Sequence, residues 1–427
     1  MKTSTAIRLR IPGAILPTVA LLLLAQPSGA AEDPDPDFSL EQTVKAGPFH
    51  LAPFLVIKDF GYDSNVKLGT FVESADFTLT VGPGARAVLP LGRAAALSVW
   101  DEMDFALFAH DADLTHVNNS LRVKLHGYGR DLILFAEGQR DWYRERPSNE
   151  IDYRIRTIAT KDRLGATWRP ASRGSVQIYY GQSDYHYDAG NPEDVPGLDT
   201  DVISQSIAET LERLESGVGL EGRLKIRPRT TLLVETRGGW IDFESEVPQR
   251  DSTSVGMMAG LEFDPAGALR GFVKLGRKHL APENDSIDGY SGLIADSNLS
   301  LRILDRGDLR LGYRRNTEFS ILGDNLFFVV DETGLSWEHF INGRFSIEMG
   351  RRLMLIDYPI DIDIDPTQGE DLRHRADDIT HDTATIRYRM GPEMKVGLTL
   401  GRWRRNSSFN WQDYDRTTVT MLMEYVP

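Results

Sequence analysis

The sequence lacks cysteine entirely, which excludes a disulfide scaffold but leaves the compartment of the protein open. Beyond residue 30 it also lacks any apolar run close to the ~20 residues that a transmembrane helix requires. A basic excess is missing too: 63 acidic residues against 48 Lys and Arg give a net charge of −15, which argues against nucleic-acid binding. The mean hydropathy of −0.32 argues against a helical membrane protein. It does not argue against a membrane β-barrel, in which only every second strand residue is apolar.

The first 30 residues are predicted to be a cleaved secretory signal peptide. Lys2, Arg8 and Arg10 form a basic start, an apolar stretch covers 15–25, and Ser28-Gly-Ala30 offers small residues for cleavage. Residues 31–47 are acidic and contain two prolines, which is typical of a flexible tail. The composition does not change from residue 48 to residue 427, so we predict a single folded domain, 48–427, after the signal peptide 1–30 and the tail 31–47.

Alternation of apolar and polar residues dominates this domain, and the segment 297–315 shows it most clearly. Leu299, Leu301 and Ile303 alternate with Asn298, Ser300 and Arg302; after a turn at 305–308, Leu309, Leu311 and Tyr313 alternate with Arg310, Gly312 and Arg314. Strand side chains point to opposite faces with period two, so this hairpin has one apolar and one cationic face. The apolar face would meet a second sheet in a soluble sandwich, or lipid in a membrane barrel whose polar face lines a lumen.

The lengths of the connections between such segments distinguish a soluble sandwich from a membrane barrel. Short turns lie at 90–93, 127–130, 170–174, 227–229, 264–267, 305–308, 341–344 and 391–393. Longer, acidic connections lie near 65–75, 110–114, 144–152, 185–213, 243–252, 281–288, 320–325, 357–382 and 405–415. Strict alternation of short and long connections is typical of outer-membrane barrels with short periplasmic turns and long extracellular loops. We therefore predict an all-β fold, a single antiparallel transmembrane β-barrel of about 18 strands.

The same alternation predicts which side chains face lipid. They include Leu121, Val123, Leu164, Ala166, Trp168, Val218, Leu220, Leu224, Val255, Met257, Phe263, Ile386, Tyr388, Leu398, Leu400, Val419, Met421 and Tyr425. Trp168, Phe263 and Tyr388 each precede a short turn, and Tyr425 precedes the end of the chain. This shared position indicates an aromatic girdle at one membrane interface, although strand propensity alone also favours aromatic residues.

The segment 201–216 departs from the strand pattern. Ile203, Ile207, Leu211 and Leu214 are spaced by three and four residues, which is helical periodicity, with Asp201 as an N-cap. This predicts a short helix in the long loop 185–213 that caps or enters the pore. The alternative is that the second half of the segment begins the eighth strand of the barrel.

Four short motifs in the first part of the domain resemble a bacterial family. They are Phe60-Gly-Tyr-Asp-Ser-Asn-Val66, Val81-Gly-Pro-Gly84, Leu89-Pro-Leu-Gly92 and Arg144-Glu-Arg-Pro147. This family comprises porin-like outer-membrane β-barrels that are often encoded beside exopolysaccharide synthesis and export genes. The resemblance implies an outer-membrane barrel and a conduit for polysaccharide. It supplies no catalytic residue that could be transferred to this sequence.

Cations on the predicted lumen face gather near the short turns. The candidate solute path comprises Arg122, Lys124, Arg163, Arg223, Lys225, Arg270, Lys274, Arg302, Arg310, Arg314, Arg387 and Arg389. Acids on the same face are fewer. Glu332 and Glu338 on neighbouring strands can neutralise part of the cluster of Arg302, Arg310 and Arg314, and we predict a residual positive potential there. A basic ring in a pore selects anions, and planar guanidinium groups suit carboxylates, phosphates and sugars. The alternative is that these cations only pair with acids on neighbouring strands.

No motif for metal binding or catalysis stands out, and we predict neither a cofactor nor a metal site. The loop 361–365 resembles the start of a calcium loop, but Pro366 and Leu372 occupy the glycine and bidentate-acid positions. The polar cluster His374, Asp377, Asp378, His381 and Asp382 matches no zinc spacing. No serine or carboxylate pair with a histidine can be distinguished from ordinary loop residues, so we predict that the protein is not an enzyme.

The sequence thus predicts a non-enzymatic channel in the outer membrane of a Gram-negative bacterium, surrounded by outer-membrane lipid. The leading function is a conduit for polysaccharide export, with an acidic polysaccharide as cargo, periplasmic export components as partners and no nucleic acid. The alternatives are a passive porin for small polar or anionic solutes, and a structural or surface barrel acting through its acidic loops.

Overall fold

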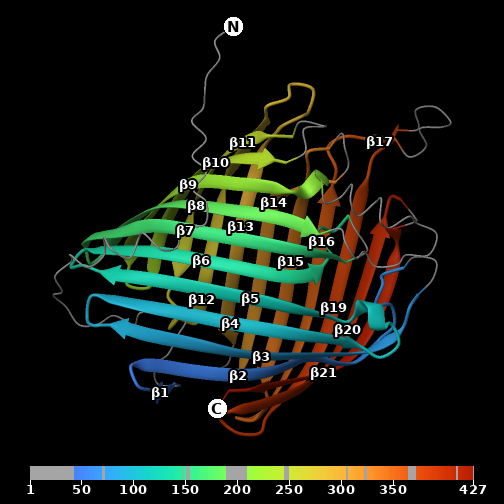
Figure 1. Ribbon diagram of the computed structural model, residues 1–427, viewed down its shortest axis with the longest axis horizontal. Helices are drawn as coiled ribbons and strands as arrows, with labels where there is room; N and C mark the ends of the chain where they lie inside the picture. The colour runs from blue at the N-terminus through green and yellow to red at the C-terminus, as the bar shows by residue number, and fades with distance from the viewer. Residues whose placement is uncertain are drawn as a thin grey trace.

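The computed structural model describes residues 43–69, 73–146, 148–150, 154–188, 209–244, 250–303, 306–321, 325–363, 372–409 and 412–426. These residues form a 19-stranded antiparallel sheet that closes on itself. Closure occurs because β2 (Phe49–Asp63) pairs with β3 (Asp76–Leu91) on one side and with β21 (Tyr414–Tyr425) on the other. Figure 1 shows the resulting barrel, with β2 to β9 forming the front wall.

Eighteen strands form the closed ring and one short strand lies beside it. The remaining ring strands are β4 (Ala95–Phe108), β5 (His116–Tyr128), β6 (Leu132–Glu145), β7 (Ile155–Ala171), β8 (Gly174–Asp188), β9 (Arg213–Arg227), β10 (Thr230–Phe243), β11 (Ser252–Phe263), β12 (Leu269–Pro282), β13 (Tyr290–Ile303), β14 (Gly307–Phe319), β15 (Phe327–Phe340), β16 (Phe345–Asp357), β19 (Ala376–Arg389) and β20 (Met394–Ser407). Outside the ring lie β1 (Val44–Ala46), the two-residue strands β17 (Ile362–Asp363) and β18 (Leu372–Arg373), and a 3-10 helix at Ala112–Leu114.

Every ring strand pairs with its neighbours in sequence, so the topology is up-and-down throughout. The connections alternate between short turns, such as the one between β7 and β8, and longer segments, such as the one between β16 and β19. The prediction of eighteen strands with alternating connections is therefore confirmed. In the described part of the chain, no helix is long and apolar enough to cross a membrane.

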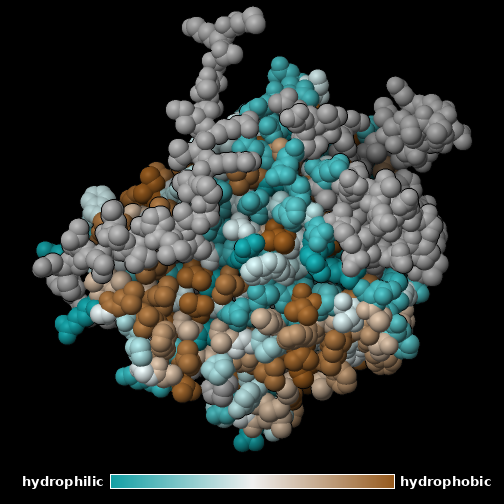
Figure 2. Space-filling model, in the orientation of Figure 1, coloured by the Kyte–Doolittle hydropathy of each residue, from teal (hydrophilic) through white to brown (hydrophobic). Residues whose placement is uncertain are grey.

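The outer surface of the barrel is apolar and exposed. Met257, Leu275 and Ile178 are each about 60% exposed, and the exposed set also includes Leu164, Trp168, Val218, Leu220, Leu224, Val255, Ile386, Leu398, Leu400, Val419 and Met421. Figure 2 shows brown apolar side chains spread over this surface. Leaving so much apolar surface in water is unfavourable by roughly 25 cal/mol per Å², whereas lipid removes this cost. The exterior is therefore the lipid-facing surface, as the alternation predicts.

Aromatic side chains lie at the short-turn end of this surface. Trp168 is 54% exposed near the end of β7, and Tyr425 is the last residue of β21. Tyr388 lies near the end of β19, and its ring centroid is 4.5 Å from that of Phe345 at the start of β16. These positions are those expected of rings at a membrane interface.

Three predictions concern segments at the edges of the described residues. The signal peptide 1–30 lies outside them, but the last residues of the expected flexible tail form β1, which pairs with the start of β2. Residues 201–208 also lie outside, residues 209–211 are helical, and residues from Arg213 onward belong to β9, the eighth ring strand. Each of the two interpretations of 201–216 therefore holds for part of the described residues. The acidic loop 361–365 is described only as far as Asp363. Among the described residues, no group of acids and histidines could hold a metal ion.

One hairpin leaves the wall of the barrel at the long-loop end. β13 and β14 pair only as far as Ala295 and Arg315, whereas β14 continues its pairing with β15 as far as Phe319 and Phe327. The free end of the β14–β15 pair, which we call the inner hairpin (residues 316–321 and 325–330), therefore separates from β13. β14 loses its neighbour β13 there, and β15 pairs with β16 only as far as Val329 and Asp357, so the end of the pair can bend out of the ring.

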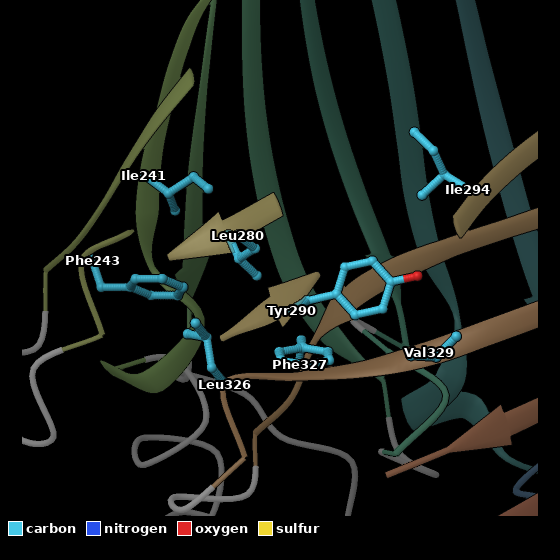
Figure 3. Close-up of a cluster of buried hydrophobic side chains, with 8 residues drawn as sticks. All are labelled: Ile241, Phe243, Leu280, Tyr290, Ile294, Leu326, Phe327 and Val329. Carbon is cyan, nitrogen blue, oxygen red and sulfur yellow. The ribbon is translucent and has the colours of Figure 1, made fainter. Parts of the chain in front are cut away.

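Burial shows that the inner hairpin bends into the lumen. By the alternation of β15, Phe327 and Val329 should share the lipid face with Leu335 and Trp337, which are 50% and 41% exposed. Instead they are buried, in a cluster with Ile241 of β10 and Leu280 of β12, both of which point inward. In Figure 3, Phe243, Leu280 and Tyr290 of the wall approach Leu326 and Phe327.

The opposite face of the inner hairpin is buried as well. Phe328 and Val330 pack with the inward-facing side chains of Ile356 and Ile379 and with Tyr358, and Phe328 and Tyr358 are fully buried. The hairpin thus contacts the wall formed by β10–β13 on one side and the wall formed by β16 and β19 on the other. It lies on the inner side of the wall at the long-loop end, between these two flanking parts of the ring, and both buried apolar clusters lie there.

Candidate functional site: the barrel lumen

The lumen side of the wall carries the polar half of each alternating strand. Arg122, Lys124 and Arg163 line one cavity, and Lys274 and Arg314 line another. Most of the other predicted path residues contact acids of neighbouring strands: Arg223, Arg270, Arg302, Arg310 and Arg387. Lys225 and Arg389 are exposed near short turns. The predicted residues therefore do not form one continuous ring but divide into local groups.

Around β13–β19 the cations are paired with carboxylates. Arg310 contacts Glu338 at 2.6 Å and Glu348 at 3.1 Å, and Arg387 contacts the same two acids. Arg302 lies 3.7 Å from Asp308, and Arg314 lies 3.6 Å from Glu318. The expected pairing with Glu338 is present, but Asp308 and Glu318 of β14 itself and Glu348 of β16 add to it. The acids beside Arg302, Arg310 and Arg314 are therefore not few, and the basis for predicting a residual positive potential at these three arginines is wrong.

Pairing continues along other strands of this side of the barrel. Lys274 lies 3.3 Å from Glu235 and 3.2 Å from Asp296, and Arg223 contacts Glu221 and Glu262. Arg352 with Glu332 and Lys395 with Glu424 form isolated pairs at 2.6 and 3.1 Å. A paired cation contributes little net potential to the lumen, since the field of its partner cancels most of its own beyond a few ångströms.

The wall formed by β3–β8 differs, because several of its arginines contact aromatic rings and neutral groups. The guanidinium carbon of Arg86 lies 3.8 Å from the ring centroid of Trp100, and that of Arg122 lies 5.8 Å from the same ring. The three residues are neighbours across β3, β4 and β5. Arg122 donates a hydrogen bond to Gln139 at 3.1 Å. Trp100 thus lies between two arginines.

Arg163 repeats the arrangement on β7. Its guanidinium carbon lies 3.9 Å from the ring centroid of Tyr179 and 5.3 Å from that of Phe135, and it donates a hydrogen bond to the Gln177 amide oxygen at 3.0 Å. Among the described residues, no carboxylate forms an ion pair with Arg86, Arg122 or Arg163. We call these three residues the arginine wall. A stacked ring satisfies a guanidinium face without cancelling its charge.

Several of these rings lie flat against glycines. A Cβ on Gly219 would lie 2.1 Å from the Tyr179 ring, and a Cβ on Gly84 would lie 2.2 Å from the Phe54 ring. The missing side chains allow the rings to lie along the wall instead of projecting across the lumen. The wall therefore presents guanidinium edges to the lumen, held in place by the rings beneath them.

The inner hairpin is anchored by buried charged residues from other long loops. The Glu150 carboxylate accepts hydrogen bonds from the Ser320 hydroxyl at 2.6 Å and from the Ile321 amide at 2.7 Å. Arg250, 1% exposed, donates to the carbonyl oxygens of Ser320 and Leu326. Three segments that are far apart in the sequence are thereby joined at one buried point.

Burial changes the proton affinity of these loop groups. Burial raises the pKa of the Glu150 carboxyl above its ordinary value of 4.5, although the hydrogen bonds from Ser320 and Ile321 oppose this shift. Burial lowers the pKa of the Arg250 guanidinium to about 10. The sequence analysis missed both residues, because a single charge in a loop carries no pattern that distinguishes it from surface charges.

The geometry defines a class of protein: a closed β-barrel with an apolar exterior, a charged lumen and a segment folded inside it, which is an outer-membrane porin-like channel. Residues 42–425 match the family described as "Putative beta-barrel porin 2", and the chain belongs to this family. The resemblance to outer-membrane porin-like barrels noted in the sequence is confirmed. No curated protein sequence matches the chain.

Solved outer-membrane barrels resemble the fold at low sequence identity. OpdK from Pseudomonas aeruginosa, in complex with vanillate, is 11% identical with a TM-score of 0.49, covering 88% of this chain and 98% of OpdK. OccK7 from the same organism is 12% identical with a TM-score of 0.46, and the match covers 90% of this chain and 99% of OccK7. The FrpB iron transporter from Neisseria meningitidis is 10% identical with a TM-score of 0.48, covering 86% of this chain and 63% of FrpB.

Proposed function

We propose that the protein is an anion-preferring channel that carries small carboxylate-bearing solutes across the outer membrane. The observation that supports this proposal is the contrast between the two sides of the lumen. The cations on the β13–β19 side have carboxylate partners, whereas the arginine wall has rings and amide oxygens. The fixed positive charge that a passing anion meets is therefore concentrated on one wall, and guanidinium edges offer carboxylates two parallel hydrogen bonds.

The reversal potential of the purified channel in a planar bilayer under a KCl gradient tests the proposal. In the native protein we expect a reversal potential whose sign shows anion preference. In the variant Arg86→Gln/Arg122→Gln/Arg163→Gln we expect the reversal potential to shift clearly towards zero. As a control, Arg352→Gln/Glu332→Gln with Lys395→Gln/Glu424→Gln removes two isolated pairs without changing the net charge. This control should leave the reversal potential unchanged. A native reversal potential at zero, or one of cation preference, would reject the proposed function.

Export of an acidic polysaccharide, the leading prediction from the sequence resemblance, adds one requirement to this mechanism. An extended sugar chain has to pass the inner hairpin, which is folded into the lumen and contacts the walls on both sides of it as well as Glu150 of the connection between β6 and β7. Export would therefore require the hairpin to move, and a polyuronate should cross lipid vesicles containing the channel only when the hairpin is released. We likewise propose that periplasmic export components take part and that residues 1–30 are cleaved as a signal peptide.

A further inference from the structure

A hollow in the lumen wall lies next to Arg163. Gly181, Gly217 and Gly239 are direct neighbours in the hydrogen-bonded register of β8, β9 and β10, and Arg163 of β7 continues the row. All three glycines share the inward face of their strands with lumen residues. We call this surface the glycine bay.

The three glycines do not have the same reason to lack a side chain. A Cβ on Gly217 would lie 2.7 Å from the Gly238 carbonyl oxygen, and one on Gly239 would lie 3.0 Å from that of Ser216, so close backbone approach requires glycine there. A Cβ on Gly181 would meet nothing closer than the Asp162 carbonyl oxygen at 3.8 Å. Close backbone packing therefore explains the glycines at 217 and 239. At Gly181, next to Arg163, the wall has room for a side chain, and this room is left empty.

This space belongs to a cavity of about 480 Å³. Ile241 of β10 and Phe319 of the inner hairpin contribute to its lining, so the bay lies beside the segment that crosses the lumen. The bay and the inner hairpin therefore line the same space inside the lumen. The volume lies within the range of small-molecule binding sites.

The charges around the bay favour an anion. Its cations are Arg122, Lys124, Lys161, Arg163, Arg237 and Lys278, against the inward-facing carboxylates of Glu137 and Glu215. Lys161 and Arg237 pair with acids, as does Glu215 with Arg213. Arg163 at one edge and Lys278 at the other have neutral partners: Lys278 donates to the Thr317 hydroxyl at 2.7 Å. Neither of these two cations forms an ion pair among the described residues, and both line the same cavity.

The shape of the bay restricts the body of the ligand. One face of the Arg163 guanidinium lies against Tyr179, so its edge is the part available to a carboxylate. The glycine row offers a nearly flat floor without side chains, against which a ring can lie close to the backbone. A carboxylate attached to a six-membered ring matches both features, and either a sugar acid or an aromatic acid supplies this chemistry.

We propose that the glycine bay binds a ring-bearing carboxylate, with the carboxylate at the edge of Arg163 and the ring over Gly181. This inference rests on the proposed function and identifies the binding site within the channel. It makes Gly181 a determinant of specificity, because any larger side chain there occupies the place of the ring. The contribution of Gly181 is space, and its replacement removes no charge from the lumen.

Transient block of the single-channel current by added solute tests this proposal. The probes are sodium glucuronate, sodium benzoate and neutral glucose, each added to native channel and to Gly181→Leu. Gly334→Leu is the matched control, because Gly334 is a lumen-facing glycine of β15 and a Cβ added to it would have nothing within 4 Å. We expect glucuronate or benzoate, but not glucose, to block native channel and the control.

In Gly181→Leu the apparent affinity for the blocking carboxylate should fall by about tenfold or more, the loss expected when a ring is displaced from a formed pocket. Block by glucuronate alone would identify sugar acids as the ligand class. Block by benzoate alone would identify aromatic acids as the ligand class. Unchanged block in Gly181→Leu, an equal loss in Gly334→Leu, or equal block by glucose would overturn the proposal. An intact anion preference in the same channels would show that the bay assignment had failed while the proposed function stood.

Discussion

At the scale of single residues, the partner of a cation decides what the cation does. Arg310 and Arg163 look alike in the sequence, since each is a polar residue of an alternating strand. Arg310 lies between two carboxylates, whereas Arg163 lies on two aromatic rings. The first stabilises the wall and contributes little to the field, and the second keeps its charge available to the lumen.

The two faces of a strand should respond differently to the same new charge. We expect Leu398→Arg, on the lipid face and 49% exposed, to destabilise the barrel by about 2–4 kcal/mol, the cost of a cation near the bilayer midplane. Thr399→Arg, one residue along, directs its charge into the aqueous lumen and loses only a hydrogen bond to Thr385 at 3.0 Å. Urea unfolding in lipid vesicles measures both free energies. Equal penalties at the two positions would contradict the assignment of the faces.

At the scale of elements, the inner hairpin is the one described segment of the wall that departs from the ring. It gives up pairing with β13, and the backbone hydrogen bonds lost there are replaced by burial of both faces and by the contacts of Glu150 and Arg250. Beyond Val329 the hairpin has no sheet neighbour on either side and is held by packing and by other loops, so local changes can release it while the barrel stays folded.

Removing one side chain from the packing of the inner hairpin should open the channel. Phe328→Ala deletes a fully buried ring, a change that costs about 3–5 kcal/mol in a packed core. Because the barrel strands do not depend on this contact, we expect the open-state conductance to rise in a planar bilayer. The control is Phe340→Ala on the same strand, whose side chain is 38% exposed. A rise of the same size in the control would contradict the assigned position of the hairpin.

The anchor at Glu150 should make the inner hairpin sensitive to pH. A carboxyl whose pKa is raised by burial binds its proton more tightly in the folded loops than in the unfolded chain. Its stabilising contribution is therefore fully present in acid and is lost as the pH rises from about 4.5 through the raised pKa. We expect amide exchange of residues 326–330, corrected for intrinsic rates, to show more protection at pH 4.5 than at pH 7.

The variant Glu150→Gln should remove this difference, because an uncharged amide keeps the same protonation state at both pH values. Glu283→Gln, at an exposed position between β12 and β13, should leave it in place. Equal pH dependence in native protein and Glu150→Gln would show that another group controls the hairpin.

At the scale of the whole molecule, the alternation of short and long connections fixes the orientation of the barrel in the outer membrane. Glu150 and Arg250 of two long connections hold the inner hairpin, whereas the short turns between β7 and β8 or β15 and β16 only reverse the chain. Outer-membrane barrels place short turns in the periplasm. The inner hairpin, the anchoring loops and the upper side of the glycine bay therefore belong to the extracellular half.

Cysteine labelling of whole cells tests this orientation. The protein has no cysteine, so a single introduced thiol reports one position without background. Ser286→Cys, in the exposed connection between β12 and β13, should react with a membrane-impermeant maleimide. Asn342→Cys, in the exposed turn between β15 and β16, should react only after the cells are lysed. Labelling of Asn342→Cys in intact cells would reverse the orientation.

The sequence by itself determined the ring, its strands and its faces. Alternation within a strand depends only on neighbouring residues, and so do the turns at 341–344 and 391–393; both patterns are local and can be read without knowing distant contacts. The strand number and the lipid-facing positions Leu220 and Leu398 follow from them. The separation of β14 from β13 leaves no such local trace, because Phe327 and Val329 alternate as if they faced lipid.

Only the tertiary structure decided which charges remain available in the lumen. Strand tilt and register bring Arg310 to Glu338 and Glu348 and carry Arg163 onto Tyr179, and neither distance is encoded in the spacing along one strand. The same holds for Glu150, which meets Ser320 across 170 positions of the chain. Electrostatic interaction falls with distance in space and not along the sequence, so the selectivity of the channel is a property of the closed barrel.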